Sequence, residues 1–250
     1  MEDQERLVQR IVPIDEAIDL AMTVNAVTTI PRTLSGVQAI VVVPGQGEWT
    51  RLTYAIRLFN LHPEIKYLLI AGHTWDEKAF VKLDIDYLRK LGLTRANGVV
   101  QVTDWDDLEK AECRTDEVIL KCHAYHTMEQ SDWMVQKVQE LGITSLAVVA
   151  PPYHAIRVYL TMLKAFIRGS VQPIPMIPMS VPESLETISP EKGESMWEMQ
   201  SGEFGRIRKY RENGWVATLA ELHAYLASSM WAAFAAQTAM YTQNADARQI

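Results

Sequence analysis

The chain alternates short apolar runs with longer amphipathic segments, and this alternation restricts its fold more than any other feature. Four runs rich in β-branched residues and leucine occupy residues 38–44, 65–73, 116–122 and 145–152. A strand that is buried on both faces reads as a continuous apolar run, and helices between such strands make them parallel. We therefore predict an α/β fold with an open, mostly parallel, Rossmann-like sheet flanked by helices.

The helices and the remaining segments follow from the same pattern. Apolar residues at helical spacing predict helices over residues 50–63, 76–93, 127–143 and 153–169. The prolines in residues 171–179 favour an edge strand, because proline cannot donate to a sheet ladder. Residues 103–117 are acidic and indicate an insertion or a short surface helix. We divide the chain into an N-terminal helical segment (1–36), a Rossmann-like domain (37–179) and a C-terminal loop and helical extension (180–250).

The C-terminal extension contains one long apolar pattern. Apolar residues repeat every three or four positions and predict a single helix over residues 215–241: Trp215, Leu219, Leu222, Leu226, Met230 and Phe234. This helix packs against the domain or, alternatively, forms the seam of a homodimer. It could also cover the ligand site. Glu221, His223 and Gln237 interrupt the apolar run, so we do not expect a membrane span.

Composition limits the partners of the chain. Hydrophobic residues make up 48% of the 250 residues, which is enough for one large core. The 24 basic and 31 acidic residues give a net charge of −7, so the chain lacks the positive charge of a general nucleic-acid binder. A local basic site for a small anion is compatible with this net charge. We expect no nucleic-acid partner.

The cysteines and the N-terminal residues indicate a compartment. The chain has two cysteines, Cys113 and Cys122, which we interpret as free thiols in a reducing cytosol, with a disulfide as the alternative. The first 22 residues are charged from the start and contain no apolar stretch that resembles a signal peptide. We therefore predict a soluble cytoplasmic protein without a membrane partner.

Polar residues and glycines follow each of the four apolar runs. These segments are "PGQGEWTR" (44–51), "AGHTWDE" (71–77), "HAYHTMEQ" (123–130) and "PPYHAIR" (151–157). Four of the six histidines lie in them: His73, His123, His126 and His154. The carboxyl ends of parallel strands meet at one edge of a sheet, where ligands bind in open α/β folds. The sequence therefore predicts a ligand site at this edge.

Small and basic residues supply the candidate binding groups. Gly45 and Gly47 bracket Gln46, so the backbone can turn tightly and approach a ligand closely. Arg51, near the start of the next helix, suits an oxyanion. Alternatively, the glycines form only a tight connection and Arg51 is a surface residue. We assign ligand binding of a small anionic molecule to Gly45, Gln46, Gly47, Arg51, Gly72, His73, Thr127, Tyr153 and Arg157.

Two residues are candidates for catalysis. His154 lies three residues before Arg157, so both lie on one helix face, and His154 could act as a general acid or base. Glu129 could act as a base or accept a ligand hydroxyl. Alternatively, His154 caps its helix, Arg157 forms a salt bridge and Glu129 only complements the helix dipole. Thr127 with Gln130 fits a capping box.

The histidines also raise the question of a metal. The segment "CHAYH" supplies Cys122, His123 and His126, and His73 or His154 could complete a tetrahedral set. The paired histidine spacing HExxH is not present in the sequence. We therefore predict that the site uses no metal.

The order of these motifs resembles the SanA, ElyC and YdcF family, long known as a domain of unknown function. The resemblance covers about residues 38–178 and rests on "VVVPGQG" with Arg51–Leu52, "LLIAGH" with Asp76 and Glu77, "TMEQ", and "PPYHAIR". Gln130 departs from the family, which prefers asparagine there. The chain lacks the membrane anchor of SanA-like and ElyC-like members, so the soluble YdcF-like branch is the more similar one. The resemblance implies a Rossmann-like fold and a ligand site at the sheet edge, and S-adenosylmethionine binding is associated with a YdcF-like member.

These observations lead to three functional hypotheses. The first is a small-molecule enzyme that binds a phosphorylated or nucleotide-like ligand at the sheet edge and hydrolyses or transfers a phosphate ester or anhydride. The second is a non-catalytic protein that binds S-adenosylmethionine or a nucleotide. The third is a scaffold that self-associates through the C-terminal helix. The sequence identifies neither the substrate nor a cofactor.

Overall fold

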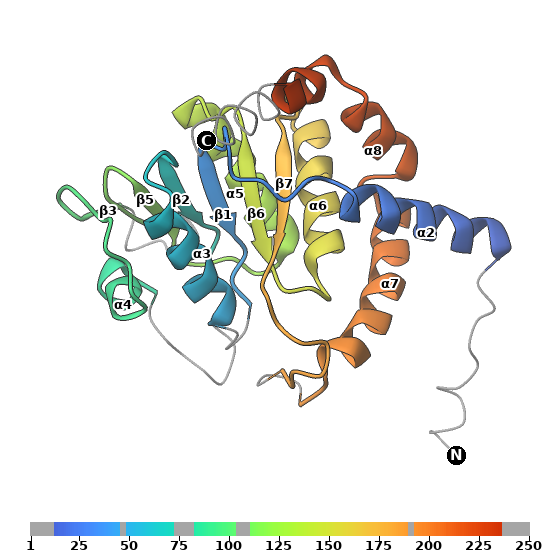
Figure 1. Cartoon of the computed structure of the whole chain (residues 1–250), viewed down its shortest axis with the longest axis horizontal. Coiled ribbons are helices and arrows are strands. Elements are labelled where there is room, and N and C mark those ends of the chain that lie inside the picture. Colours follow the sequence, from blue (N-terminus) through green and yellow to red (C-terminus); the bar gives the residue numbers. More distant parts are fainter. Residues whose placement is uncertain (1–12, 46–48, 73–82, 104–110, 190–192, 237–250) are drawn as a thin grey trace, which may run out of the picture.

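A computed structural model of the chain describes residues 13–45, 49–72, 83–103, 111–189 and 193–236. It contains an open seven-stranded sheet flanked by helices, as Figure 1 shows, and confirms the predicted α/β class. The strands are β1 (Ala39–Val42), β2 (Tyr67–Ile70), β3 (Gln101–Thr103), β4 (Glu112–Arg114), β5 (Val118–Lys121), β6 (Leu146–Ala150) and β7 (Met176–Ser180). Their order is β3-β4-β5-β2-β1-β6-β7, and β5, β2, β1, β6 and β7 are parallel.

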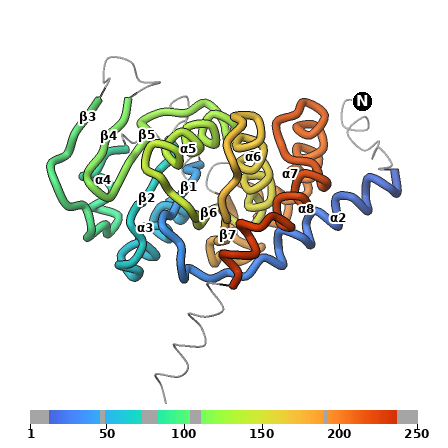
Figure 2. The backbone as a smooth tube through the Cα atoms, turned by 90° about the horizontal axis from the view of Figure 1, so that it is seen from above, coloured from blue at the N-terminus to red at the C-terminus, as the bar shows by residue number. Residues whose placement is uncertain are grey.

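The helices are α2 (Ile14–Thr28), α3 (Thr50–Leu61), α4 (Ile85–Lys90), α5 (Thr127–Leu141), α6 (Ala155–Arg168), α7 (Met196–Glu212) and α8 (Leu219–Leu226). Helix α3 covers one face of the sheet, and α5 and α6 cover the other (Figure 2). Helices α2, α7 and α8 lie beyond α6 (Figure 2). The Tyr225 hydroxyl donates to Ile174 O (2.8 Å) and accepts from Met176 N (2.9 Å), which fixes α8 to β7.

The core is continuous from the N-terminal segment to the C-terminal extension. The four residues of β1 are fully buried, as a central parallel strand requires. Val27 of α2, Val41 of β1 and Leu222 of α8 belong to the same cluster of buried side chains. The segments on either side of the Rossmann-like region therefore share its hydrophobic core.

The strand order reverses at β1, and this reversal positions the site. Strand β1 pairs with β2 on one side and with β6 on the other, both in parallel. The chain leaves β1 through α3 toward β2, whereas α5 brings it back to β6 on the opposite side. The loops after β1 and β6 therefore diverge and leave a crevice at their carboxyl ends, where open α/β sheets bind ligands.

Of the two edge strands of the sheet, β7 was predicted from the sequence and β3 was not. Strand β7 is an edge strand, as predicted, and Pro178 lies within it. In the described part of residues 103–117 the predicted surface helix is wrong, because β3 and β4 pair antiparallel and extend the sheet, whereas the alternative of an insertion is compatible with this hairpin. Cys113 faces the core, and the Glu112 carboxylate accepts from Lys137 Nζ (2.8 Å) of α5. This neutralised carboxylate explains how an acidic segment packs against the body of the protein.

The C-terminal extension also differs from its prediction. Residues 196–212, predicted partly as loop, form α7, which starts with a capping box between Ser195 and Glu198. The single helix predicted from Trp215 is wrong: α8 ends at Leu226, and a second helical segment covers residues 229–236. The Ser228 hydroxyl accepts from Trp231 N (3.4 Å), as a serine at a new helix start does.

Candidate functional site

A polar cavity of about 270 Å³ lies at the carboxyl ends of β1 and β6. The loop after β1, the first turns of α3, α5 and α6, and one side of α7 form its walls. The structure brings six of the predicted site residues together in its lining: Gly45, Arg51, Thr127, Tyr153, His154 and Arg157. Residues from three of the four predicted polar segments therefore meet at the place where the strand order reverses.

Arg51 joins the two loops that border the crevice. Its side chain is buried, and it donates from Nη1 to Val43 O (2.8 Å) after β1 and from Nη2 to the Tyr153 hydroxyl (3.3 Å) after β6. A Cβ atom at Gly45 would lie 2.5–2.8 Å from this guanidinium group, so a larger residue there would displace the Arg51 side chain from its position. The positive charge of Arg51 therefore lies against the backbone of the glycine loop.

His154 and Arg157 meet a carboxylate from α7. His154 Nδ1 lies 3.0 Å from Glu203 Oε2 and 3.0 Å from Arg157 Nη2. Arg157 donates from Nε to Glu203 Oε2 and from Nη2 to Glu203 Oε1 (3.2 Å), and Arg206 Nη1 lies 2.5 Å from Oε1. The exposed fraction of Glu203 is 2%, so this carboxylate is buried between two arginines and a histidine.

The surroundings set the charge of these groups. Burial, followed by the positive charge of Arg157, lowers the pKa of His154 from 6.5 to about 4, although Glu203 acts in the opposite direction. Burial raises the pKa of Glu203, but its contacts with His154 and Arg157 outweigh burial and hold this pKa well below its usual range. Near neutral pH the site therefore contains a neutral imidazole beside an ionised carboxylate.

This charge state determines the tautomer of His154. An ionised Glu203 has no proton to donate, and Arg157 Nη2 has a second acceptor in Glu203 Oε1. We therefore assign the imidazole proton to Nδ1, from which it is donated to Glu203 Oε2. Nε2 is then the unprotonated nitrogen, and it makes no hydrogen bond within the part of the chain that the structure describes.

Gln130 holds two of the loops behind the cavity. Its Nε2 donates to Pro44 O (3.3 Å) and to Gly72 O (2.7 Å), which connects the turns after β1 and β2. Gly72 has a φ of +78°, and a Cβ there would lie 2.8 Å from the backbone of His123. Gly72 therefore shapes the second turn without lining the cavity.

The start of α5 differs from the predicted capping box. The N-cap is His126, whose Nδ1 accepts from Glu129 N (3.2 Å), so Gln130 has no capping role. Thr127 is the first helical residue, and its hydroxyl accepts from Arg157 Nη1 at 3.5 Å. The competing backbone acceptors, Pro44 O and Gly72 O, explain why Gln130 turns away from the helix end.

Glu129 has its own partners. Its carboxylate accepts from Lys121 Nζ (2.5 Å) and from Tyr125 N (2.9 Å), and it does not line the polar cavity. Burial raises the pKa of Glu129, but the hydrogen bond with Lys121 outweighs burial and keeps this pKa below its usual value. An ionised, paired carboxylate at this position stabilises the turn between β5 and α5.

Three predicted residues, Gln46, Gly47 and His73, lie outside the described residues. His123 and Cys122 of the predicted metal alternative are buried. Within the described ranges, histidine, cysteine, aspartate and glutamate side chains form no group of three or more that could hold a metal ion. Among the same residues, no helix has both the length and the apolar character needed to cross a bilayer.

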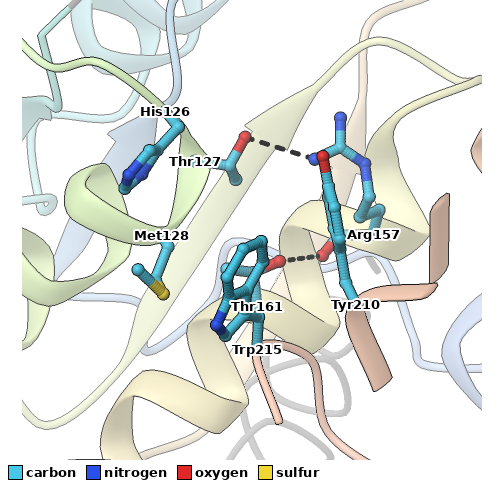
Figure 3. A pocket seen from close by; sticks show the side chains of 7 residues that line it. All are labelled: His126, Thr127, Met128, Arg157, Thr161, Tyr210 and Trp215. Carbon is cyan, nitrogen blue, oxygen red and sulfur yellow. Dashed lines mark hydrogen bonds between the residues drawn. The ribbon is translucent and has the colours of Figure 1, made fainter. Parts of the chain in front are cut away.

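A second cavity of about 250 Å³ adjoins the first (Figure 3). Side chains of α5 lie on one of its sides, and those of α6, α7 and the turn after α7 lie on the other (Figure 3). Four residues line both cavities: His126, Thr127, Arg157 and Tyr210. Met128, Thr161 and Trp215 line only the second.

The C-terminal extension was predicted only as a possible cover for the ligand site, and none of its residues was predicted as a site residue. Glu203, Arg206, Tyr210 and Trp215 line the cavities, although no motif marks them. One signal was available, because "SMWE" at residues 195–198 is a capping box that predicts a helix start. A helix from there places residues 203, 206 and 210 on one face.

No family model, curated protein or solved structure matches this chain. The resemblance to the SanA, ElyC and YdcF family therefore stays a prediction from the motif order.

Proposed function

We propose that this protein is an enzyme that binds a small phosphorylated molecule in the polar cavity and cleaves its phosphate ester or anhydride bond. The observation that carries the proposal is the local charge. Among the described residues, Arg51, Arg157 and Arg206 line the cavity together with one ionised carboxylate, Glu203, while His154 is neutral. This excess of positive charge occurs in a chain with a net charge of −7. A local cationic hollow suits an anion.

Two helix starts support the same ligand. Helices α3 and α6 follow β1 and β6, and within the described residues the side chains of their N-cap residues, Trp49 and His154, do not cap the first amides. The first turn of a helix binds phosphate oxygens favourably, because it carries the positive end of the helix dipole. The cationic side chains and both helix starts belong to the same edge of the sheet.

His154 supplies the proton transfer in this proposal. Nε2 takes a proton from a water molecule as the water oxygen attacks phosphorus. The bond between phosphorus and the leaving oxygen breaks, the leaving oxygen takes up a proton from solvent, and His154 releases its proton to solvent, so an ester and water give an alcohol and phosphate. An acceptor hydroxyl in place of water makes the reaction a transfer. The arginines stabilise the negative charge of the transferred group.

Glu203 positions the imidazole. Its hydrogen bond with Nδ1 (3.0 Å) holds the tautomer whose Nε2 is unprotonated. A bound phosphate raises the pKa of His154, because a negative charge favours the imidazolium form. A bound ligand therefore makes His154 a stronger base than its pKa of about 4 in the free protein indicates.

The test measures phosphate release from a panel of sugar phosphates, nucleotides and simple phosphate esters. His154→Gln is expected to lower kcat about 100-fold or more, because a general base usually accelerates a reaction by at least this factor. His223→Gln is the matched control, because His223 is exposed on α8. Thermal unfolding establishes that both variants are folded. Equal rates for wild type and His154→Gln would contradict the role of His154.

A second pair of variants tests the cationic hollow. Arg206→Gln removes a half-exposed arginine that lines the cavity, and we expect a rise in KM of about tenfold, the loss of one charged hydrogen bond. Arg208→Gln is the control, because Arg208 lies on the same helix but pairs with Glu16 of α2. Ligand binding by wild type without any turnover would instead support a non-catalytic binding protein.

A further inference from the structure

The second cavity has an aromatic wall that the end of α7 builds. Trp215 N donates to Tyr210 O (2.8 Å), Gly214 N donates to Arg211 O (3.0 Å), and Gly214 has a φ of +71°. These bonds form a Schellman motif, which turns the chain back onto the helix. The turn places the Trp215 ring 5.3 Å from the Tyr210 ring.

The Trp215 ring keeps an accessible surface. Its exposed fraction is 40%, and Figure 3 shows the ring on the side of the cavity opposite Met128. Helix-end contacts of this kind need only an apolar side chain. A half-exposed indole beside a cavity also provides a surface on which a flat ligand ring can stack.

Arg157 connects this wall to the polar cavity. Its guanidinium group lies 5.5 Å from the centre of the Tyr210 ring and lines both cavities. A ligand with its anionic group at Arg157 therefore has an aromatic cavity directly beside that group. The hydroxyls of Thr127 and Thr161 and the His126 ring add polar groups to the same lining.

We infer that the second cavity holds a planar heteroaromatic ring of the same ligand, so that the substrate class is a nucleoside phosphate or a similar phosphate ester of a ring-bearing alcohol. This inference rests on the proposed function, which places the phosphate in the polar cavity. Trp215 is its specificity-determining residue and stacks on the ring.

The experiment measures binding by calorimetry with the full chain. The probes are the methylene phosphonate analogues of adenosine 5′-monophosphate and of ribose 5-phosphate, which contain no ester bond at phosphorus to cleave. We expect wild type to bind the adenosine analogue at least about tenfold more tightly than the ribose analogue, as base stacking on an aromatic ring provides. Trp215→Leu, which retains an apolar residue at the helix end, is expected to reduce this preference to about twofold or less.

The matched control is Trp197→Ala. Trp197 lies in the first turn of α7 with an exposed fraction of 67% and lines neither cavity. It is expected to keep the full preference for the adenosine analogue. Equal binding of the two analogues by wild type, or an unchanged preference in Trp215→Leu, would overturn the inference.

The two proposals fail in different ways. If the ribose analogue binds wild type and binds more weakly to Arg206→Gln, the proposed phosphate site is supported even when the adenine ring contributes nothing to affinity. If adenosine without a phosphonate binds as tightly as its analogue and depends on Trp215, the ring site stands and the proposed phosphate site is wrong.

Discussion

His154 is a histidine whose surroundings decide its charge. Burial and the charge of Arg157 hold its pKa at about 4, while Glu203 fixes the proton on Nδ1. The lowered pKa and the hydrogen bond to Glu203 together leave Nε2 unprotonated near neutral pH. The same histidine on an exposed helix would titrate near 6.5.

This lowered pKa makes stability depend on pH. Between pH 6.5 and about 4 the unfolded chain protonates this histidine, whereas the folded chain does not. The unfolded state therefore binds more protons in this window, and stability falls as the pH falls. We expect His154 to account for a loss of about 3 kcal/mol over the window.

Urea unfolding of wild type, His154→Gln and His223→Gln at several pH values between 4 and 7 measures this contribution. The free energy of unfolding should depend less on pH in His154→Gln than in the other two proteins. Parallel curves for all three would show that His154 titrates alike in the folded and unfolded states.

Helix α7 contacts the start of α6 through a buried carboxylate. Glu203 accepts from Arg157 of α6 and from Arg206 of its own helix, and its exposed fraction is 2%. The same helix carries Tyr210, and the turn after it carries Trp215, so this contact is one of those that hold the aromatic wall. The attachment of this helix and the orientation of His154 are therefore coupled.

Glu203→Gln removes the charge that Arg157 and Arg206 share. We expect the free energy of unfolding to fall by about 3–5 kcal/mol, as it does when one partner of a buried ion pair is removed. Glu212→Gln on the same helix is the control and should change stability by less than about 0.5 kcal/mol, because Glu212 is exposed. Chemical denaturation measures both variants, and equal effects would exclude a special role of Glu203.

Elements differ in how well the sequence predicts them. The buried strands β1, β2, β5 and β6 fall within the predicted apolar runs, because burial on both faces leaves a continuous pattern. The β3–β4 hairpin was missed, since its strands have three residues each and the pairing of Glu112 with Lys137 depends on another element. Short strands carry too few residues for a periodic signal.

The whole molecule combines an acidic surface with a cationic hollow. The net charge of −7 repels small anions at long range, whereas Arg51, Arg157 and Arg206 attract them at one place.

The buried faces of α8 and of the segment after it contact the same chain through Leu222, Tyr225 and Trp231. The homodimer through this region stays a prediction. Sedimentation over a range of protein concentrations tests it by measuring the molecular mass.

An anion that binds only the folded protein should stabilise it. At 100 times its dissociation constant, phosphate is expected to add about 2.7 kcal/mol, which raises Tm by about 5–10 °C for a chain of this size. Scanning calorimetry in phosphate and in chloride of equal ionic strength separates binding from screening. Equal Tm values in the two salts, or the same rise in Arg206→Gln, would contradict binding at this cavity.

The candidate site was predicted in part. Arg51, Tyr153, His154 and Arg157 were found because each follows a recognisable strand and the carboxyl ends of parallel strands must meet at one edge. Glu129 has the expected place in the chain, but the nearby Lys121 takes its carboxylate away from the cavity. Sequence position determines the edge to which a side chain belongs, and local partners determine where it points.

The amino-acid order alone was enough for the parallel strands and for the edge that carries the site, because both follow from local apolar periodicity and from the chirality of strand–helix–strand units. The folded structure was needed for the partner of His154, a carboxylate 49 residues away, and for the aromatic wall at Trp215. Contacts of that kind depend on how the C-terminal helices pack against α6, and a packing arrangement between distant elements leaves no periodic pattern in the chain.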